Sequence, residues 1–529
     1  MKKVIITIFV FTTSLLIAQT EQQSIELPDF VITGKQSVNV PIAVKKKPDF
    51  ISTLSQEFFS PQLTPEELPL LISSDPVPVR PEIKTFNDYV NGTLKVQIGN
   101  YSLPVGELYL NQSYDNYLLN AKVWGSNIKE YIPNAGYNSS GLSLRNDFFF
   151  STKSNFLPGV KIKVAADYIR DSYKLFASQN PTLLRETNGG SAIFSISSSY
   201  NRWINFGFDL GGNILSLSEN KLKETNISSN GLFEFKQNNF AAGVKGFFSK
   251  QLLNNNLSGV DNYSFYSTEG YIKIFPNNSL NFTLGINYAA NSSNSFFAPF
   301  GSLEYNLDKG LTLSAGFNPH VKYFNTSDFI KRNIYYNPGL IDNIFSEYKT
   351  DFNGMIKYEY EKLFSLSFSG RYSKVNNYLY YNDAVTAGKF DLNVLPEAKI
   401  VSAGLDLKVY PERFGYLFGE LLFKNASDQL DNVIPYEPKL STSVTYGYNF
   451  YFGLNIKIRY SMAFDVYTNI SNSDKLDNYN DVSLSLNYEI FAGLKLTADF
   501  QNIMNRTNFV WKQYQEKPFD VLLGIEYRW

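Results

Sequence analysis

The chain has 529 residues and carries 48 basic against 49 acidic side chains, so it shows no basic footprint for nucleic acid. It has no cysteine, which excludes disulfides, thiolate metal sites and iron–sulfur clusters. His320 is the single histidine, so neither a histidine metal site nor a catalytic triad is expected. We predict no cofactor, no metal and no catalytic residues.

Aromatic residues make up 16% of the chain, with 37 tyrosines and 44 phenylalanines. Aromatic girdles at the two interfaces of a membrane barrel would explain this excess. An array of soluble β-sandwiches is the alternative, but such domains rarely need so much tyrosine.

The N-terminus has the form of a secretory signal. Lys2 and Lys3 precede an apolar run over residues 4–17, and cleavage is expected after Ala18. A single helical anchor is the alternative, but the run is shorter than a membrane span needs. No other stretch reaches 18 apolar residues, so a mature protein in a membrane would cross it as a closed barrel.

Residues 19–87 differ in composition from the rest of the chain. Six prolines lie between Pro61 and Pro81, which argues against a packed sheet there. We interpret 19–87 as a proline-rich periplasmic arm, either poorly ordered or laid into the mouth of the domain that follows.

From Asn91 onward, apolar and polar side chains alternate in segments of about ten residues. Leu280, Leu284 and Tyr288 face one way in such a segment, and Asn281 and Thr283 face the other. The same pattern recurs at 160–168, 204–210, 454–460 and 482–489. An apolar lumen enclosed by so many strands could not be filled, so the apolar faces must contact lipid. The other faces carry charges of both signs, which we place in the lumen: Lys161, Lys163, Asp167, Lys457, Arg459, Lys495, Asp499, Glu526 and Arg528.

The connections alternate between tight turns and long loops. Tight turns are expected near 201–203, 237–239, 276–278, 308–310, 361–362, 411–414 and 491–493. Longer loops are expected near 126–139, 174–188, 253–262, 319–347, 427–436, 468–477 and 507–517. This asymmetry is typical of outer-membrane barrels. We predict an all-β transmembrane antiparallel barrel over 88–529, with about 22 strands in a range of 18–22 and both barrel ends on the periplasmic side.

The chain ends on a strand with one apolar face, formed by Val521, Leu523, Ile525, Tyr527 and Trp529. This ending resembles the terminal strand of bacterial outer-membrane β-barrels. The resemblance implies a cell outer-membrane location, contact with outer-membrane lipid and insertion by the barrel-assembly machinery.

Several segments of the C-terminal half resemble TonB-dependent outer-membrane receptors, in that family's order. They cover roughly residues 335–529 and are Asn337-Pro338-Gly339-Leu340 followed by Glu347 and Gly354, Phe368 to Tyr381, Gly404 to Leu407, Ile434 to Pro438, and Asp499 to Met504. Near the start, Leu27 to Gly34 resembles the segment that opens these receptors. The resemblance implies that Asp29, Phe30, Val31, Ile32, Thr33 and Gly34 pair with a TonB-like periplasmic protein by strand addition.

The chain departs from this family in one respect. A plug domain of well over a hundred residues usually follows the opening segment, whereas fewer than 60 proline-rich residues separate Gly34 from the first predicted strand. We therefore expect a receptor-like barrel without a standard plug.

Three functions are compatible with these features. The first is a transport barrel, acting as a porin-like channel or as a transporter gated by its arm or by a partner. The second is a structural or assembly barrel that anchors a periplasmic partner through the arm. The third is a barrel enzyme with His320 as its base, which we disfavour because a loop histidine is usually a solvated surface residue. Tyr323, Phe324, Tyr335 and Tyr336 are candidate loop contacts for a ligand such as a sugar, with packing across the mouth as the alternative.

Overall fold

The computed structural model describes residues 90–155, 157–219, 221–254, 263–307, 310–339, 345–361, 363–384, 387–410 and 414–529. The expected signal at 1–18, the arm at 19–87 and the segment Asp29–Gly34 lie outside these residues. Within the described ranges, no helix is both long and apolar enough to cross a membrane.

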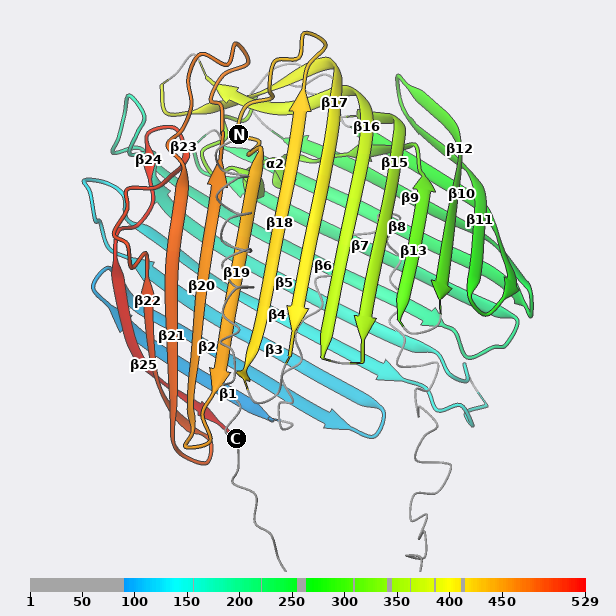
Figure 1. The fold of residues 1–529 in the computed structure, drawn as a ribbon, viewed down its shortest axis with the longest axis horizontal. Coiled ribbons are helices and arrows are strands. Elements are labelled where there is room, and N and C mark those ends of the chain that lie inside the picture. Colours follow the sequence, from blue (N-terminus) through cyan, green and yellow to red (C-terminus); the bar gives the residue numbers. More distant parts are fainter. Residues whose placement is uncertain are drawn as a thin grey trace, which may run out of the picture. The chain divides into compact units, whose positions relative to one another are not determined.

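The described chain is almost entirely β-structure (Figure 1). The first twelve strands are β1 Gly92–Gly99, β2 Ser102–Tyr114, β3 Tyr117–Ile128, β4 Tyr137–Phe149, β5 Lys161–Lys174, β6 Leu184–Ser198, β7 Ile204–Leu217, β8 Leu222–Gln237, β9 Phe240–Asn254, β10 Tyr263–Asn277, β11 Leu280–Asn291 and β12 Ser295–Leu307. The remaining elements are β13 Leu311–Phe317, β14 His320–Tyr323, α2 Thr326–Arg332, β15 Phe345–Tyr360, β16 Phe364–Asp383, β17 Phe390–Val409, β18 Tyr416–Ser427, β19 Leu440–Asn449, β20 Leu454–Phe464, β21 Tyr479–Phe491, β22 Leu494–Gln501, β23 Phe509–Trp511, β24 Tyr514–Gln515 and β25 Asp520–Arg528.

The strands of the ring pair antiparallel in chain order, β22 pairs with β25, and β1 closes the ring against β25, while β23 and β24 pair only with each other. β13 and β14 both pair with β15, so they act as one strand that is interrupted at Pro319. Proline has no amide hydrogen to give to a ladder, which explains the break. Counted in this way, the described residues form a closed 22-strand barrel, which confirms the predicted fold class and strand number.

The two ends of the barrel differ in the length of their connections. At one end, which we call the short-turn end, β8 joins β9 through 238–239 and β21 joins β22 through 492–493. Both barrel termini lie at this end, where the amide of Trp529 donates to the carbonyl of Gly92 at 3.1 Å. At the other end, the long-loop end, β20 joins β21 through 465–478 and β22 joins β25 through 502–519. The predicted asymmetry is therefore confirmed.

The outer face of the ring is apolar. Leu284 is 61% exposed, and Ile98, Ile214 and Leu523 are exposed to a similar degree. A soluble protein does not display large apolar side chains over a whole surface, whereas acyl chains solvate them. Of the row predicted at the C-terminus, Leu523, Ile525 and Tyr527 on β25 and Trp529 just after it are exposed, whereas Val521 is half-buried. The ring is thus a transmembrane barrel of the outer-membrane type.

The inner face is polar, and the charged residues predicted for the lumen lie on it, opposite the exposed apolar rows. Opposite charges pair along this face. Lys161 with Asp147 at 3.2 Å and Lys245 with Glu269 at 2.8 Å join neighbouring strands, whereas Lys95 with Asp499 at 3.2 Å and Lys273 with Glu234 at 2.8 Å reach across an intervening strand. Cross-strand pairs of this kind stabilise a sheet and hold lumenal side chains in place.

At the long-loop end, β16 and β17 extend beyond the part of the wall that has one apolar and one polar face. Tyr378 and Tyr380 pack into one apolar cluster, and Leu379 and Tyr381 pack into another on the opposite face. All four are about 9% exposed, so this part of the strand is buried on both sides. The second face is covered by loops, which define the site described next.

Candidate functional site

Loops at the long-loop end pack against one another over the barrel mouth. We call the segments 175–183, 324–339, 387–389, 434–437 and 509–516 the roof. They follow strands on different sides of the ring, yet all of them except 387–389 contribute side chains to one apolar cluster. Figure 1 shows α2, β23 and β24 at this end.

The closest approach within the roof is between Gly388 and Ala177. Gly388 follows β16 and Ala177 follows β5, nearly half the ring away. Gly388 has φ of +74°, and a Cβ there would run into the backbone of Ala177 and Ser178. Only glycine meets both demands, because it tolerates positive φ and has no side chain. The hydroxyl of Tyr514 also donates to the carbonyl of Gly388 at 2.5 Å, which brings a third loop to the same point.

A buried ion cluster joins the roof to the wall. The Arg185 side chain on β6 is 0% exposed and donates at 2.8 Å to the carbonyls of Ile334 and Tyr336. Its guanidinium also pairs with Glu219 in the turn between β7 and β8, and Lys389 pairs with the same carboxylate. Burial alone would raise the pKa of Glu219, but the two cations beside it hold that pKa below its usual value.

Aromatic rings fill the space between the roof loops. Tyr335 stacks on Tyr514 with ring centres 3.4 Å apart, and Trp511 lies 5.0 Å from Phe390 and 4.7 Å from Tyr436. Four of these five rings, those of Tyr335, Tyr436, Trp511 and Tyr514, lie in the predicted loops, where the sequence shows no periodic pattern. Paired rings in these orientations are worth about 0.5–1.5 kcal/mol each beyond the area they bury.

The four residues predicted to contact a ligand lie in two different places: two are packed within the roof and two line a cavity. Tyr336 is 2% exposed, and burial raises its pKa to about 12, so its phenol stays protonated. Tyr335 is partly buried against Tyr514, as described above. Tyr323 and Phe324 instead line a cavity below the roof. Whether any of the four contacts a ligand stays a prediction.

The short helix α2 forms the underside of the roof. Asn325 and Asp328 form a reciprocal capping box at its start. Glu224 on β8 accepts from the amides of Thr326 at 2.8 Å and Ser327 at 3.3 Å, which ties the helix to the wall. The sequence predicted an irregular loop over 319–347, so β14 and α2 are additions to that expectation. The S/T/D/N-x-x-D/E pattern of Asn325 to Asp328 was the available signal for the helix.

A cavity of about 830 Å³ lies between α2, β14 and the inner wall formed by β7 to β12. Its wall side carries carboxamides and hydroxyls, among them Asn213, Asn230 and Ser267. Its roof side carries Lys331 and Arg332 at the end of α2. The size falls within the range of small-molecule sites, and polar groups converge on it from both sides.

A smaller cavity of about 360 Å³ adjoins the first, since both are lined by Lys322, Phe324 and Arg332. Lys424 and Glu437 line its far side, where they form an ion pair of 2.7 Å. Among the described residues, no group of three or more His, Asp or Glu side chains is arranged to hold a metal ion.

His320 lies on the wall of the larger cavity and not on a solvated loop, so the expectation of a surface histidine is wrong. Its side chain is 14% exposed and its ring stacks on Tyr348 with centres 4.6 Å apart. Nδ1 donates to the carbonyl of Asn318 at 2.8 Å and lies 3.7 Å from Asp351. The Asp351 carboxylate is already bound by Arg371 at 2.6 and 2.8 Å. This histidine is therefore part of the packed lumenal wall.

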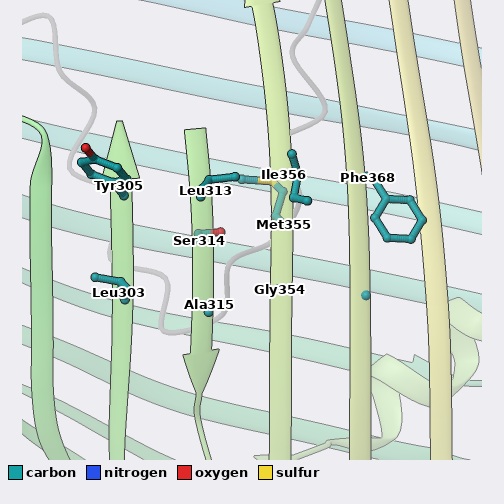
Figure 2. Close-up of a pocket in the computed structure, with 10 residues that line it drawn as sticks. Leu303, Tyr305, Leu313, Ser314, Ala315, Gly354, Met355, Ile356 and Phe368 are labelled. Atoms are coloured by element: carbon teal, nitrogen blue, oxygen red, sulfur yellow. The ribbon is translucent and has the colours of Figure 1, made fainter. Parts of the chain in front are cut away.

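The outer wall also carries a groove, of about 410 Å³, which crosses β12, β13, β15 and β16 (Figure 2). Its floor includes Ala315 and Gly354, and its sides include Leu303, Ile356 and Phe368. The groove is apolar and lies on the lipid-facing side, so it offers nothing to a polar solute.

No protein-family model and no curated protein matches the chain, but solved structures match its fold. The FrpB iron transporter from Neisseria meningitidis aligns with a TM-score of 0.65 at 11% identity, over 84% of this chain and 82% of that one. The siderophore receptor PirA from Acinetobacter baumannii aligns with a TM-score of 0.64 at 11% identity, over 84% and 81%. The ferric-catecholate import receptor Fiu from E. coli K12 aligns with a TM-score of 0.63 at 8% identity, over 84% and 82%. At such identities the likeness establishes the fold, and that fold is the barrel of outer-membrane receptors.

Proposed function

We propose that this chain is an outer-membrane transport barrel whose outer mouth is closed by the roof. The observation that carries the proposal is the convergence of loops from opposite sides of the ring on Gly388, Ala177 and Tyr514. A mouth spanned by loops held through side-chain contacts is closed at rest and opens when those contacts break. Long loops lie on the outer side of known outer-membrane barrels, which supports a position of the roof toward the exterior.

The lining of the lumen supports passage of a polar solute. Charges of both signs alternate along the inner wall, as in the pairs of Lys95 with Asp499 and Lys245 with Glu269. Such a wall is wetted by water and favours neither cations nor anions over its whole length. Proteins with this fold include an iron transporter and a copper transporter, OprC, which is a precedent for solute transport.

The finer part of the proposal concerns the N-terminal arm. We place residues 19–87 in the periplasm, without a standard plug, and Asp29–Gly34 as the segment that pairs with a TonB-like protein. Loss of energised uptake on deletion of 29–34, with the barrel still inserted, is the expected result. If uptake is unchanged in that variant, the remaining interpretations are a passive channel and a channel that is gated by the arm.

The second candidate is a structural barrel that anchors a periplasmic partner through the arm. The buried cluster of Arg185, Glu219 and Lys389 favours it, because a roof secured by largely buried, paired charges is costly to open. In that case the roof is a permanent lid and the barrel serves only as an anchor.

Conductance in planar bilayers separates the two candidates. Four proteins are compared: the full chain, Gly388→Ala, a chain lacking 19–87, and a chain with both changes. Alanine at 388 clashes with the backbone at Ala177, so it forces the roof loops apart. Gly339→Ala is the matched control, because Gly339 lies in the same roof without a positive φ or a close neighbour.

For a transport barrel we expect Gly388→Ala to raise the frequency or size of conducting steps, most strongly in the chain that lacks the arm. Gly339→Ala should behave as the parent does. Four non-conducting proteins, each folded and inserted, would refute the transport proposal, and co-purification of a periplasmic partner with the full chain would then support the anchor.

A further inference from the structure

The cavities beneath the roof carry an excess of positive charge. Lysine and arginine side chains line them from α2, β14, β9 and β18, namely Lys245, Lys322, Lys331, Arg332 and Lys424. The acidic side chains that line them are Glu269, Asp328 and Glu437. Two of these acids are engaged by cations of the same wall, Glu269 by Lys245 at 2.8 Å and Glu437 by Lys424 at 2.7 Å.

The excess is concentrated at the end of α2. Lys331 and Arg332 are both exposed, and within the part of the chain that the structure describes neither head group has an ion-pair partner. The third acid, Asp328, accepts the amide of Asn325 at 3.0 Å in the capping box. It is therefore directed at the start of the helix, away from the two cations at its end.

The environment of Arg332 suits anion recognition. Its guanidinium lies over the ring of Phe324, 4.7 Å from the ring centre, and it lines both cavities. A guanidinium held over an aromatic ring makes no hydrogen bond to that ring's carbons, so its N–H groups remain donors for a carboxylate or phosphate. Lys331 adds a second point charge beside it, and amides on the facing wall, such as Asn213 and Asn230, offer further donors.

We propose that the larger cavity is a binding site for a small polyanion that carries carboxylate or phosphate groups, held by Arg332 and Lys331. The proposal deepens the transport role and rests on it for the route by which the solute arrives. The cavity of about 830 Å³ admits a solute of drug size. The aromatic side chains of Tyr323 and Phe324 contact the less polar part of such a solute.

Calorimetry on the detergent-solubilised full chain tests this site without any transport step. The probes are citrate and inorganic phosphate, with glucose as a neutral solute of similar size. We expect saturable binding of citrate, weaker binding of phosphate and none of glucose. The affinity for citrate should fall as salt is added, because the contacts are charge–charge.

Two variants assign the binding to these residues. Lys331→Gln combined with Arg332→Gln removes both charges. The affinity for citrate should fall at least tenfold for each charge removed, because a hydrogen bond to a charged group usually contributes about 1.5–3 kcal/mol. Arg332→Lys keeps the charge but loses the two parallel N–H donors of the guanidinium, so it should give an intermediate affinity for citrate. Lys153→Gln is the matched control, since Lys153 is exposed in the turn between β4 and β5 at the short-turn end.

The outcomes separate this proposal from the transport role. Absence of citrate binding to the folded parent chain would overturn it, as would equal binding by the double glutamine variant. Either result leaves the conductance test unaffected. Conversely, citrate binding that depends on Arg332 in a non-conducting barrel would keep the anion site and refute only transport.

Discussion

At the scale of single residues, the roof is tied to the wall by largely buried charges. Arg185 satisfies two backbone carbonyls, those of Ile334 and Tyr336, as well as the carboxylate of Glu219. A buried charge is tolerated only when its partners are all in place, and removing one partner leaves the others unpaired. The contribution of Glu219 to this arrangement therefore depends on its being ionised.

This dependence predicts a loosening of the roof in acid. Because Arg185 and Lys389 lower the pKa of Glu219 in the folded state, the carboxylate contributes stability above its unfolded pKa of about 4.3, and this is lost as the pH falls through the lower folded value. Acrylamide quenching of Trp511, with the other three tryptophans replaced by phenylalanine, should increase below about pH 4. Glu219→Gln should show the higher quenching at neutral pH and no acid step. Identical curves for the two proteins would contradict the prediction.

At the scale of elements, α2 shows how a short helix is stabilised by its surroundings. Seven residues are too few for a stable isolated helix. The capping box of Asn325 and Asp328 and the carboxylate of Glu224 together occupy amides that the first turn leaves without partners. The helix therefore holds Lys331 and Arg332 in place only while these polar contacts persist.

Removing the cap should loosen this element alone. Asn325→Ala is expected to cost about 1 kcal/mol, which corresponds to roughly a fivefold loss of hydrogen-exchange protection in the helix. The amides of 329–332 report on the helix, and those of β11 report on the barrel wall. Citrate binding should weaken in parallel, since the two cations lose their fixed position. A protein whose wall amides lose protection to the same extent would show instead that the cap supports the whole fold.

At the scale of the whole molecule, the outer and inner faces of the barrel wall are suited to different environments. The outer row contacts lipid and the inner row is polar, and adjacent residues of one strand belong to opposite rows. Leu284 on β11 points outward and is 61% exposed, whereas its neighbour Thr283 points inward. The same alternation exposes Leu523, Ile525 and Tyr527 on β25 and Trp529 after it. We propose that these residues and Val521 form the surface that the assembly machinery recognises.

This arrangement predicts opposite outcomes for one substitution at adjacent positions. Leu284→Arg places a charge on the lipid face and should destabilise the inserted barrel by about 2–4 kcal/mol. Thr283→Arg places the same charge in the lumen and should change the free energy of unfolding by less than about 0.5 kcal/mol. Unfolding by guanidinium in lipid vesicles measures both. Equal destabilisation by the two variants would mean that the outer face does not contact lipid.

The barrel was predictable because its evidence is local. Strand period, apolar faces and turn residues are all properties of neighbouring positions, so segments such as 280–288 and the terminal strand identify both their structure and the side that faces lipid. Turn lengths follow in the same way, and together they predicted the strand number and the two unlike ends. The resemblance of 335–529 to a receptor family pointed to the same fold.

The roof and its cavities were decided by tertiary structure. Nothing near Gly388 in the sequence shows that its Cβ position is filled by Ala177, and no local pattern pairs Arg185 with Glu219 and Lys389. Closing the ring brings together loops that are far apart along the chain, and only then do their charges and aromatic rings meet. The amino-acid sequence by itself therefore determined a lipid-facing barrel, because the alternation of apolar and polar side chains is a property of adjacent residues. The roof and the cationic cavity beneath it arise from contacts between distant residues, which exist only once the barrel has closed.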